Sequence, residues 1–421
     1  MTDLVLGIDI GTSGVRIAAT DRANALIALS AAPIMAPVQA GLRILQDPAI
    51  WWRALEAALG TLDLKGHAVR GIAVDGTSGT ILAVTGTGEP QGLASMYNDV
   101  AEAADLAMVA GVASRDTAAL GATSALARAL PMRGEGLRII HQADWIAGRL
   151  SGRFDVTDEN NALKSGYDPV ARRWPEWIAQ TGLDPAMFPA VVPAGTRTGT
   201  ITRAMAAKFG LPEDTAIIAG TTDGCASFLA SGASDPGDGV TALGSTLTLK
   251  LLSARPVFAP DFGIYSHRIG DQWLAGGASN TGGAVLAAYF SREDLARLTP
   301  LLDPDRPTGL DYYPLSKPGE RFPINDPAFT PRLEPRPADD RVFLQAILEG
   351  ISAIEASAYA KLAELGATPL ASIRSSGGGA ANPAWTRLRL KALGVPERPS
   401  LSEHAAVGTA RLAWRGLGHA N

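Results

Sequence analysis

The feature that most constrains this chain is a short unit that occurs three times. Each copy is a buried apolar strand, a tight turn of Gly, Thr and Ser, and an acidic residue at the strand end. The copies span residues 4–20, 70–85 and 215–224, and their acids are Asp9, Asp75 and Asp223. Because their spacing is irregular, they do not predict a solenoid. They predict related halves of an α/β protein whose strands end at a shared cleft.

Helical patterns alternate with these strands. We expect helices at 47–58, 142–150, 204–209, 341–365 and 382–393, several with a capping residue before them and a glycine after them. Two strands joined at 244–246 are expected within 239–252. A proline-rich stretch at 303–340 also carries aromatic residues, so we expect an irregular arm packed on a second domain.

Composition narrows the class of protein. The 421 residues predict two domains, and the 46% apolar and 19% charged residues are typical of a well-buried globular chain. The formal charge is -5 with no Lys/Arg run, which disfavours nucleic acid as a partner. Cys225 is the single cysteine, so neither a disulfide nor a multi-cysteine metal cage is expected. No signal peptide or membrane span is apparent, and we expect a cytoplasmic protein.

The Gly/Thr/Ser turns are candidate phosphate sites, because backbone N–H groups and hydroxyls presented together bind anions. Two further turns, 244–246 and 376–379, extend the set. For any single turn, a hairpin tip chosen for its backbone angles is the stronger interpretation. Phosphate binding is favoured because several of these turns combine small hydroxyl residues with an acid at the strand end. The chain has no GxxxxGK[ST] loop and no GxGxxG spacing, so neither a P-loop nor a Rossmann site is expected.

Asp9 and Asp223 are the candidate catalytic carboxylates. An acid beside a phosphate-binding turn suits Mg²⁺ held partly through water, although Asp9 could equally be a turn-forming aspartate. Asp223 precedes an apolar stretch, 226–230, which makes a helix N-cap one interpretation. The other is a base that accepts the proton of a hydroxyl as it attacks a phosphoryl group.

Together these motifs resemble the FGGY carbohydrate kinases of the actin-like ATPase superfamily, whose fold is described as ribonuclease H-like. The resemblance spans essentially the whole chain. Its anchors are 7–14 (GIDIGTSG), 75–80 (DGTSGT), 161–167 (NALKSGY), 219–223 (AGTTD), 243–246 (LGST), 276–280 (GGASN) and 377–382 (GGGAAN). The strings at 75–80, 161–164 and 309–314 (GLDYYP) are similar to short D-ribulose kinases, once called xylulose kinase-like.

The resemblance implies an α/β fold of two actin-like domains with an interdomain catalytic cleft. A sugar-binding N-terminal domain would comprise 1–230 plus 405–421, and an ATP-binding C-terminal domain 231–404. Asp223 would be the general base and Asp9 would hold Mg²⁺. The implied ATP contacts are Gly11, Thr12, Ser13, Gly244, Ser245, Thr246, Gly377, Gly378, Gly379 and Asn382. The implied sugar contacts are Asp75, Thr77, Ser78, Asn98 and Asp223.

The implied activity is ATP-dependent phosphorylation of a free ketopentose, with D-ribulose converted to D-ribulose 5-phosphate. D-Xylulose or another pentulose or polyol is the close alternative. Larger pentulose kinases carry a Trp-x-Asp-x-Arg type segment where this chain has 96–100 (MYNDV), so the sugar contacts must differ there. A rival of another class is a non-catalytic, actin-like nucleotide switch. The expected partner is a small sugar, with no nucleic acid and no membrane. The residues leave the oligomeric state open between monomer and homodimer.

Overall fold

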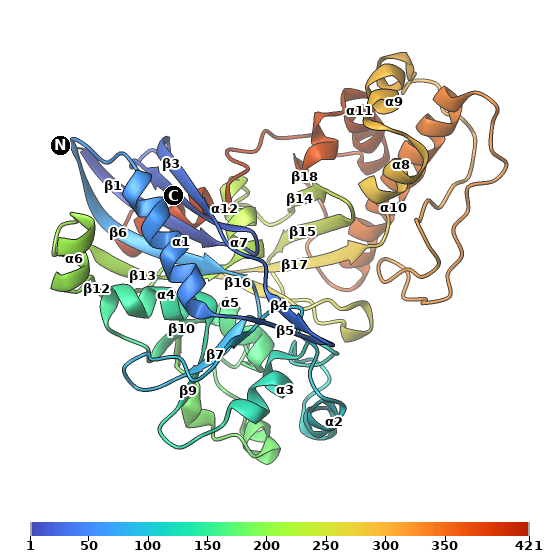
Figure 1. The fold of residues 1–421 in the computed structure, drawn as a ribbon. Helices are drawn as coiled ribbons and strands as arrows, with labels where there is room; N and C mark the ends of the chain where they lie inside the picture. The colour runs from blue at the N-terminus through green and yellow to red at the C-terminus, as the bar shows by residue number, and fades with distance from the viewer. Residues whose placement is uncertain (1, 420–421) are drawn as a thin grey trace. The chain divides into compact units, whose positions relative to one another are not determined.

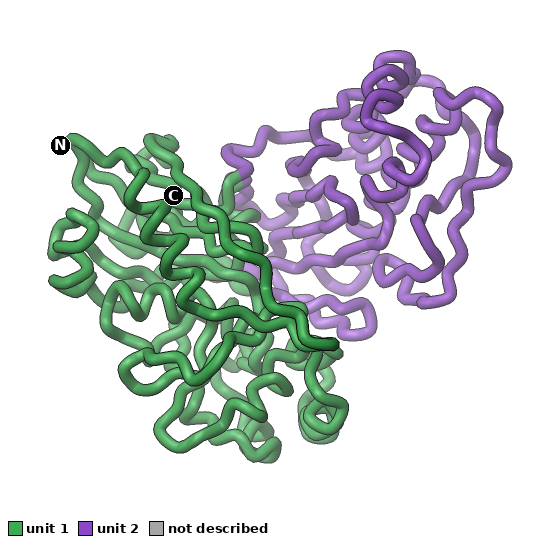
Figure 2. Tube along the Cα trace, in the orientation of Figure 1, with its two compact units in different colours: residues 1–230, 267–270, 404–421 green, residues 231–266, 271–403 purple. Residues whose placement is uncertain are grey.

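The computed structural model describes residues 2–419, which form two compact α/β units (Figures 1 and 2). Unit 1 contains the chain up to Ala230, the short segment His267–Gly270 and the chain from His404 onward. Unit 2 contains Ser231–Ser266 and Asp271–Glu403. The main chain therefore leaves unit 1 after Ala230, returns to it for His267–Gly270, and rejoins it after Glu403.

Unit 1 is built on a six-stranded sheet in the order β12-β13-β6-β1-β2-β3. The strands are β1 (Thr2–Ile10), β2 (Gly14–Thr20), β3 (Leu26–Pro33), β6 (His67–Gly76), β12 (Arg197–Thr200) and β13 (Ala216–Thr222). β1 runs antiparallel to β2 and parallel to β6, and β6 runs parallel to β13. The three acid-bearing copies of the sequence unit therefore supply three adjacent parallel strands of a single sheet.

Helices cover both faces of this sheet, which is why its central strands are continuously apolar. On one face, α1 (Pro48–Thr61) and α4 (Gln142–Ser151) pack on Leu4, Leu6 and Ile8. On the other face, α12 (Ala405–Gly416) packs on Val5, and α7 (Asp223–Ala230) packs on α12. A Cβ on Gly7 would lie 1.9 Å from the Ala406 carbonyl oxygen, so glycine is required for α12 to approach β1 this closely.

A second sheet in unit 1 has the order β4-β5-β8-β7-β9. Its strands are β4 (Val38–Ala40), β5 (Arg43–Gln46), β7 (Ile81–Val84), β8 (Ala94–Ser95) and β9 (Arg138–His141). The strand expected at 80–85 joins this sheet, so the second sequence unit is not a hairpin like the first. The remaining elements of unit 1 are α2 (Ala103–Val112), α3 (Ala125–Ala129), β10 (Val156–Asp158), α5 (Glu159–Ala162), β11 (Ala190–Val192), α6 (Arg203–Phe209) and β16 (His267–Ile269).

Unit 2 repeats the strand arrangement of unit 1, with its strands in the order β17-β15-β14-β18. They are β14 (Asp238–Leu243), β15 (Leu247–Ser253), β17 (Gln272–Ser279) and β18 (Ser372–Ser376). Consecutive strands are antiparallel, and β18 returns parallel to β14, as β6 does to β1. The helices are α8 (Gly283–Tyr289), α9 (Arg292–Leu298), α10 (Asp340–Glu364) and α11 (Pro383–Leu393). The repeat confirms the expected α/β fold with two actin-like halves.

The helices expected from the sequence are confirmed as α1, α4, α6, α10 and α11. Residues 303–339 contain neither helix nor strand, as the proline pattern predicts. Tyr312 and Phe322 of this arm are buried in the core of unit 2, where Tyr312 packs edge-on against Phe343 of α10 and Phe322 against Phe262. The aromatic residues thus hold the irregular arm on its domain.

Candidate active site

Three aspartates, Asp9, Asp75 and Asp223, lie at or directly after the ends of β1, β6 and β13. Asp9 lies opposite Asp75 in the β1–β6 register, and Asp75 lies opposite Thr221 in the β6–β13 register. Asp223 follows β13 directly as the first residue of α7. Because the carboxyl ends of parallel strands share one edge of a sheet, residues that are more than 200 positions apart in the sequence converge. The sequence-predicted acids are thus brought together in unit 1.

Asp75 lies at the centre of this group and is fully buried. Thr409 of α12 donates its hydroxyl hydrogen to Asp75 Oδ2. Burial, and then the negative charge of Asp9, raise the pKa of Asp75 well above its usual range, against the effect of the Thr409 bond. This raised pKa favours the protonated form of Asp75 beside Asp9, and Asp75 Oδ1 is a buried atom with no hydrogen-bond partner within the described residues.

Asp9 is 6% exposed, and Arg16 Nη1 approaches its carboxylate at 3.5 Å. Burial raises its pKa, and the Asp223 charge adds to this, whereas the bond from Asp75 and the charge of Arg16 lower it. Among residues 2–419, no group of three His, Cys, Asp or Glu side chains could hold a metal ion. The donor set fits Mg²⁺ bound at one carboxylate, with water and phosphate oxygens as the other ligands.

Asp223 is half-buried at the start of α7. Its Oδ1 accepts the N–H of Gly224 at 2.7 Å, so the helix-start interpretation is realised in part. Lys164, after α5, lies near it: burial lowers the pKa of Lys164, and the negative charge of Asp223 opposes that effect. Lys164 Nζ also donates to the Ser78 carbonyl oxygen at 3.2 Å. A half-buried carboxylate is chemically able to accept a proton.

The predicted sugar contacts lie on two turns, one following β6 and one following β8. Thr77 is buried, and its hydroxyl bonds to Thr80 at 2.6 Å and to Gln142 at 2.9 Å. Ser78 Oγ is a buried atom with no hydrogen-bond partner within the described chain. Asn98 is exposed on the second turn. The structure therefore places Thr77 within a supporting network and leaves Ser78 and Asn98 as side chains that can contact a ligand.

Arg128 of α3 joins the two turns, although no sequence pattern distinguishes it as a site residue. It is 2% exposed and donates to the carbonyl oxygens of Gly79 at 2.6 Å and Met96 at 3.0 Å. Burial lowers its pKa to about 10. Gln142, Lys164 and Thr409 were missed in the same way. A buried arginine, lysine or glutamine is visible in a sequence only as a polar residue inside an apolar run, which is a weak signal.

The predicted nucleotide turns follow two adjacent parallel strands of unit 2. Ala242 near the end of β14 lies opposite Ser376 at the end of β18, so the turns 244–246 and 377–379 share one sheet edge. Gly244, Ser245 and Thr246 are all exposed. Gly377 has φ +81°, and a Cβ there would lie 3.0 Å from the Leu243 carbonyl oxygen. This edge of unit 2 corresponds to the Asp9 and Asp75 edge of unit 1.

Two of the predicted nucleotide-binding residues, Asn382 and Gly379, also have structural contacts within unit 2. Asn382 caps α11, because its side chain accepts the Trp385 N–H at 3.0 Å, and its amide donates to Thr299 at 3.2 Å. Gly379 packs against the Trp385 ring, where a Cβ would lie 2.4 Å away. In unit 1, Gly11, Thr12 and Ser13 form the β1–β2 turn, with both hydroxyl residues exposed. Nucleotide contact by these residues stays a prediction.

Comparison with known proteins gives two family matches. The model of the N-terminal domain of the FGGY family of carbohydrate kinases matches residues 131–230, and that of the C-terminal domain matches residues 237–417. A xylulose kinase of Streptomyces rubiginosus is 28% identical over 438 residues, covering 97% of this chain and 87% of that protein. A ribulokinase of Anoxybacillus flavithermus is 28% identical over 124 residues, covering 27% of this chain and 21% of that one.

Solved structures agree in fold. A xylulose kinase structure from Brucella ovis matches with a TM-score of 0.85 at 22% identity, covering 99% of this chain and 91% of that one. Of the helices within residues 2–419, none combines the length and apolar character needed to cross a membrane.

Proposed function

The chain belongs to the FGGY family of carbohydrate kinases, and from this premise we propose that it transfers the γ-phosphoryl group of ATP to a hydroxyl group of a free ketopentose. The observation that carries the proposal is the convergence of Asp9, Asp75 and Asp223 at one sheet edge. A nucleotide switch of the same fold needs a phosphate-binding turn, but it has no use for a base facing a second substrate. The position of Asp223 at the start of α7, next to this sheet edge, therefore favours the kinase over the switch.

In the proposed reaction, Asp223 accepts the proton of the attacking sugar hydroxyl. Asp9 would hold Mg²⁺, which on binding neutralises charge on the phosphate oxygens. Asp75, whose pKa is raised, would lie beside Asp9 as a neutral group, and Arg16 Nη1 lies 3.5 Å from the Asp9 carboxylate. Each carboxyl thus has a separate task that follows from its own surroundings.

We propose that the residues of 1–230 and 405–421 bind the sugar and those of 231–404 bind ATP. Support for the sugar site comes from Ser78 and Asn98, whose turns are joined by Arg128. Support for the nucleotide site comes from the exposed turns 244–246 and 377–379 at one sheet edge. Asp75 and Thr77 are both buried, so they would contact the sugar from the inner side of these turns.

For the substrate, D-ribulose is our first candidate, because the motifs at 75–80, 161–164 and 309–314 resemble short D-ribulose kinases. D-Xylulose is the second candidate. The full-length match to a protein named xylulose kinase favours it, whereas the ribulokinase match covers 27% of this chain.

The test is ADP release, measured with ATP and Mg²⁺ over D-ribulose, D-xylulose, their L-isomers, the pentitols and glycerol. The proposal expects kcat/KM to be highest for a D-pentulose, and the ratio between D-ribulose and D-xylulose decides between the candidates. ADP release that no sugar accelerates, together with tight ATP binding, would instead identify a nucleotide switch.

A further inference from the structure

The end of β13 is held by two consecutive buried asparagines of α5. Asn161 Nδ2 donates to the Thr221 carbonyl oxygen at 3.1 Å, and Asn160 Nδ2 donates to Thr221 Oγ1 at 3.0 Å. Both asparagines are 1% exposed. Thr221 lies two residues before Asp223, so these bonds restrain the segment from which the proposed base projects.

This restraint matters because the β13 strand is irregular at its end. Its register with β6 shifts between Ile218 and Thr221. At the shift, Gly220 lies so close to β6 that a Cβ would be 1.8 Å from the Val74 carbonyl oxygen. An irregular strand end has fewer ladder hydrogen bonds to define its course, and such irregularities re-aim side chains near active sites. The side-chain hydrogen bonds from Asn160 and Asn161 of α5 restrain this strand end in place of the missing ladder bonds.

Asp158 sets the orientation of the Asn161 amide. Its Oδ1 accepts the N–H groups of Asn160 at 2.9 Å and Asn161 at 3.0 Å, and its Oδ2 accepts Asn161 Nδ2 at 2.6 Å. An ionised carboxylate only accepts hydrogen bonds, so it requires the nitrogen end of the amide to face it. The same nitrogen then faces the Thr221 carbonyl oxygen, which is likewise only an acceptor of hydrogen bonds.

We propose that Asn161, oriented by Asp158, is a positioning residue that holds Thr221 and thereby aligns Asp223 for proton transfer. The inference rests on the proposed kinase function, since it assigns Asp223 the role of base. It adds to that function a further aspartate, Asp158, which contacts neither sugar nor ATP. The protonation state of Asp158 controls the alignment of Asp223.

Protonation of Asp158 reverses the hydrogen-bond pattern. Because Oδ1 already accepts two backbone N–H groups, the added proton resides on Oδ2 and points at Asn161 Nδ2, which is also a donor. Turning the Asn161 amide over relieves that conflict but places its oxygen against the Thr221 carbonyl oxygen. In the first arrangement the Asn161 nitrogen loses its bond to Asp158, and in the turned arrangement it loses its bonds to both Asp158 and Thr221. The full restraint on Thr221, and with it the alignment of Asp223, therefore requires ionised Asp158.

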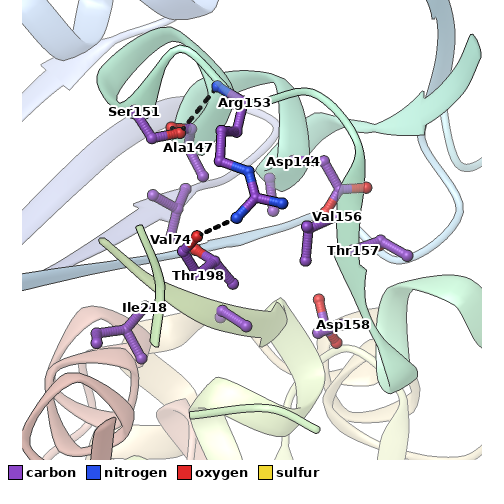
Figure 3. A pocket seen from close by; sticks show the side chains of 13 residues that line it. Val74, Asp144, Ala147, Ser151, Arg153, Val156, Thr157, Asp158, Thr198 and Ile218 are labelled. Atoms are coloured by element: carbon purple, nitrogen blue, oxygen red, sulfur yellow. Dashed lines mark hydrogen bonds between the residues drawn. The ribbon is translucent and has the colours of Figure 1, made fainter. Parts of the chain in front are cut away.

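This protonation falls in an accessible pH range. Burial, and then the negative charge of Asp144 on α4, raise the pKa of Asp158 to about 7, although the bonds from Asn160 and Asn161 lower it. A cavity of about 30 Å³, lined by Asp144, Thr157 and Asp158 (Figure 3), is large enough to admit a water molecule that carries the proton.

Several other charged groups surround Asp158 and complete its electrostatic environment. His141, at the end of β9, bonds to Asp144 at 2.7 Å. Arg153, after α4, lines the same cavity and bonds to the Thr198 carbonyl at 2.6 Å (Figure 3). On α5 itself, Glu159 lies 3.9 Å from Arg268 of β16. Asp144 is the one among these groups that contributes to the raised pKa of Asp158.

The test compares Asp158→Asn with Thr157→Ser, a buried change in the neighbouring residue that lines the same cavity and keeps the hydroxyl bonded to His141 Nδ1 at 3.0 Å. Asp158→Asn keeps an oxygen for the two backbone N–H groups but places a permanent donor against Asn161. We expect kcat to fall about 10²-fold in Asp158→Asn, with ATP affinity unchanged and the KM for the sugar changed by a smaller factor than kcat. Thr157→Ser should retain the wild-type kcat.

The pH profile separates positioning from loss of structure. Wild type and Thr157→Ser should lose kcat as pH falls through about 7, where Asp158 gains its proton. Asp158→Asn should show no change in kcat in this window, because it has no titratable group there. A wild-type kcat, or an intact transition near this pH, in Asp158→Asn would overturn the proposal.

A second measurement does not depend on any activity. Backbone hydrogen exchange in residues 219–226 should be faster in Asp158→Asn than in wild type or Thr157→Ser, while unit 2 exchanges equally in all three. Unchanged exchange in this segment refutes the restraint even if no sugar substrate is found. Faster exchange without any sugar-dependent turnover in wild type would instead reject the kinase proposal and keep the restraint.

Discussion

At the scale of single residues, each of the clustered carboxyls has a different environment, and the proposed division of labour follows from that. For Asp223→Ala we expect kcat to fall roughly 10²- to 10⁴-fold, because the proton of the attacking hydroxyl loses its acceptor. Nucleotide affinity should persist, since the predicted phosphate turns are formed by other residues. Turnover close to wild type would remove Asp223 from the mechanism.

The Asp9 side chain should matter for the metal rather than for the sugar. Asp9→Asn keeps the shape but removes the charge, so we expect a higher Mg²⁺ requirement and loss of both sugar phosphorylation and background ATP hydrolysis. Titrating Mg²⁺ against both activities measures this. If ATP hydrolysis continues at the wild-type rate, Asp9 is only a turn residue.

Asp75 should affect stability in a pH-dependent way. Its pKa is raised in the folded state, so the unfolded chain releases this proton at lower pH, and stability falls as pH rises from about 4 towards the folded-state pKa. Asp75→Asn keeps a hydrogen-bond acceptor for Thr409 and a donor for Asp9 but cannot ionise. Its melting temperature should therefore exceed that of wild type by more at pH 8 than at pH 4.5. A difference independent of pH would argue against a neutral Asp75.

At the scale of elements, the site depends on how closely α12 packs on α7, the helix that begins at Asp223. A Cβ on Gly408 of α12 would lie 1.9 Å from the Ala226 carbonyl oxygen. Gly408→Ala should therefore lower the free energy of unfolding by about 1–3 kcal/mol, through overpacking. Denaturant unfolding measures this change.

Gly60→Ala in α1 is the matched control, because a Cβ there meets no atom within 4 Å. The same substitution in that open helix position should stabilise the protein by about 0.4–1 kcal/mol. Equal effects at Gly60 and Gly408 would show that helix propensity, rather than the α7–α12 contact, determines the outcome.

At the scale of the whole molecule, the chain is divided between two units that we propose bind different substrates. A nonhydrolysable ATP analogue alone should slow hydrogen exchange in residues 241–250 and 372–386 of unit 2. The pentulose alone should do so in 75–80, 95–99 and 161–166 of unit 1. Each effect follows because bound ligand suppresses local opening of the segments it contacts. Protection by ATP confined to unit 1 would reverse the assignment of the domains.

The sequence by itself was sufficient to predict the strands that end at Asp9, Asp75 and Asp223, and the helices α1, α4, α6, α10 and α11. These rest on local signals: apolar periodicity, glycine at turns and capping residues such as Asp47 and Asn382. The same signals identified the proline-rich arm as irregular but packed. Local patterns depend on neighbours a few residues away, so a single chain reveals them.

Only the tertiary structure decided which of these elements are neighbours and what each polar side chain does there. Thr409 bonds to Asp75 from 334 positions away, and Arg128 joins turns that follow two different strands. The hydrogen bond from Asn161, whose amide also bonds to Asp158, likewise joins α5 to Thr221 of a strand 60 positions away in the sequence. Such contacts, and the pKa values that follow from burial, depend on distances in the folded chain. A linear sequence does not encode those distances in any short-range pattern.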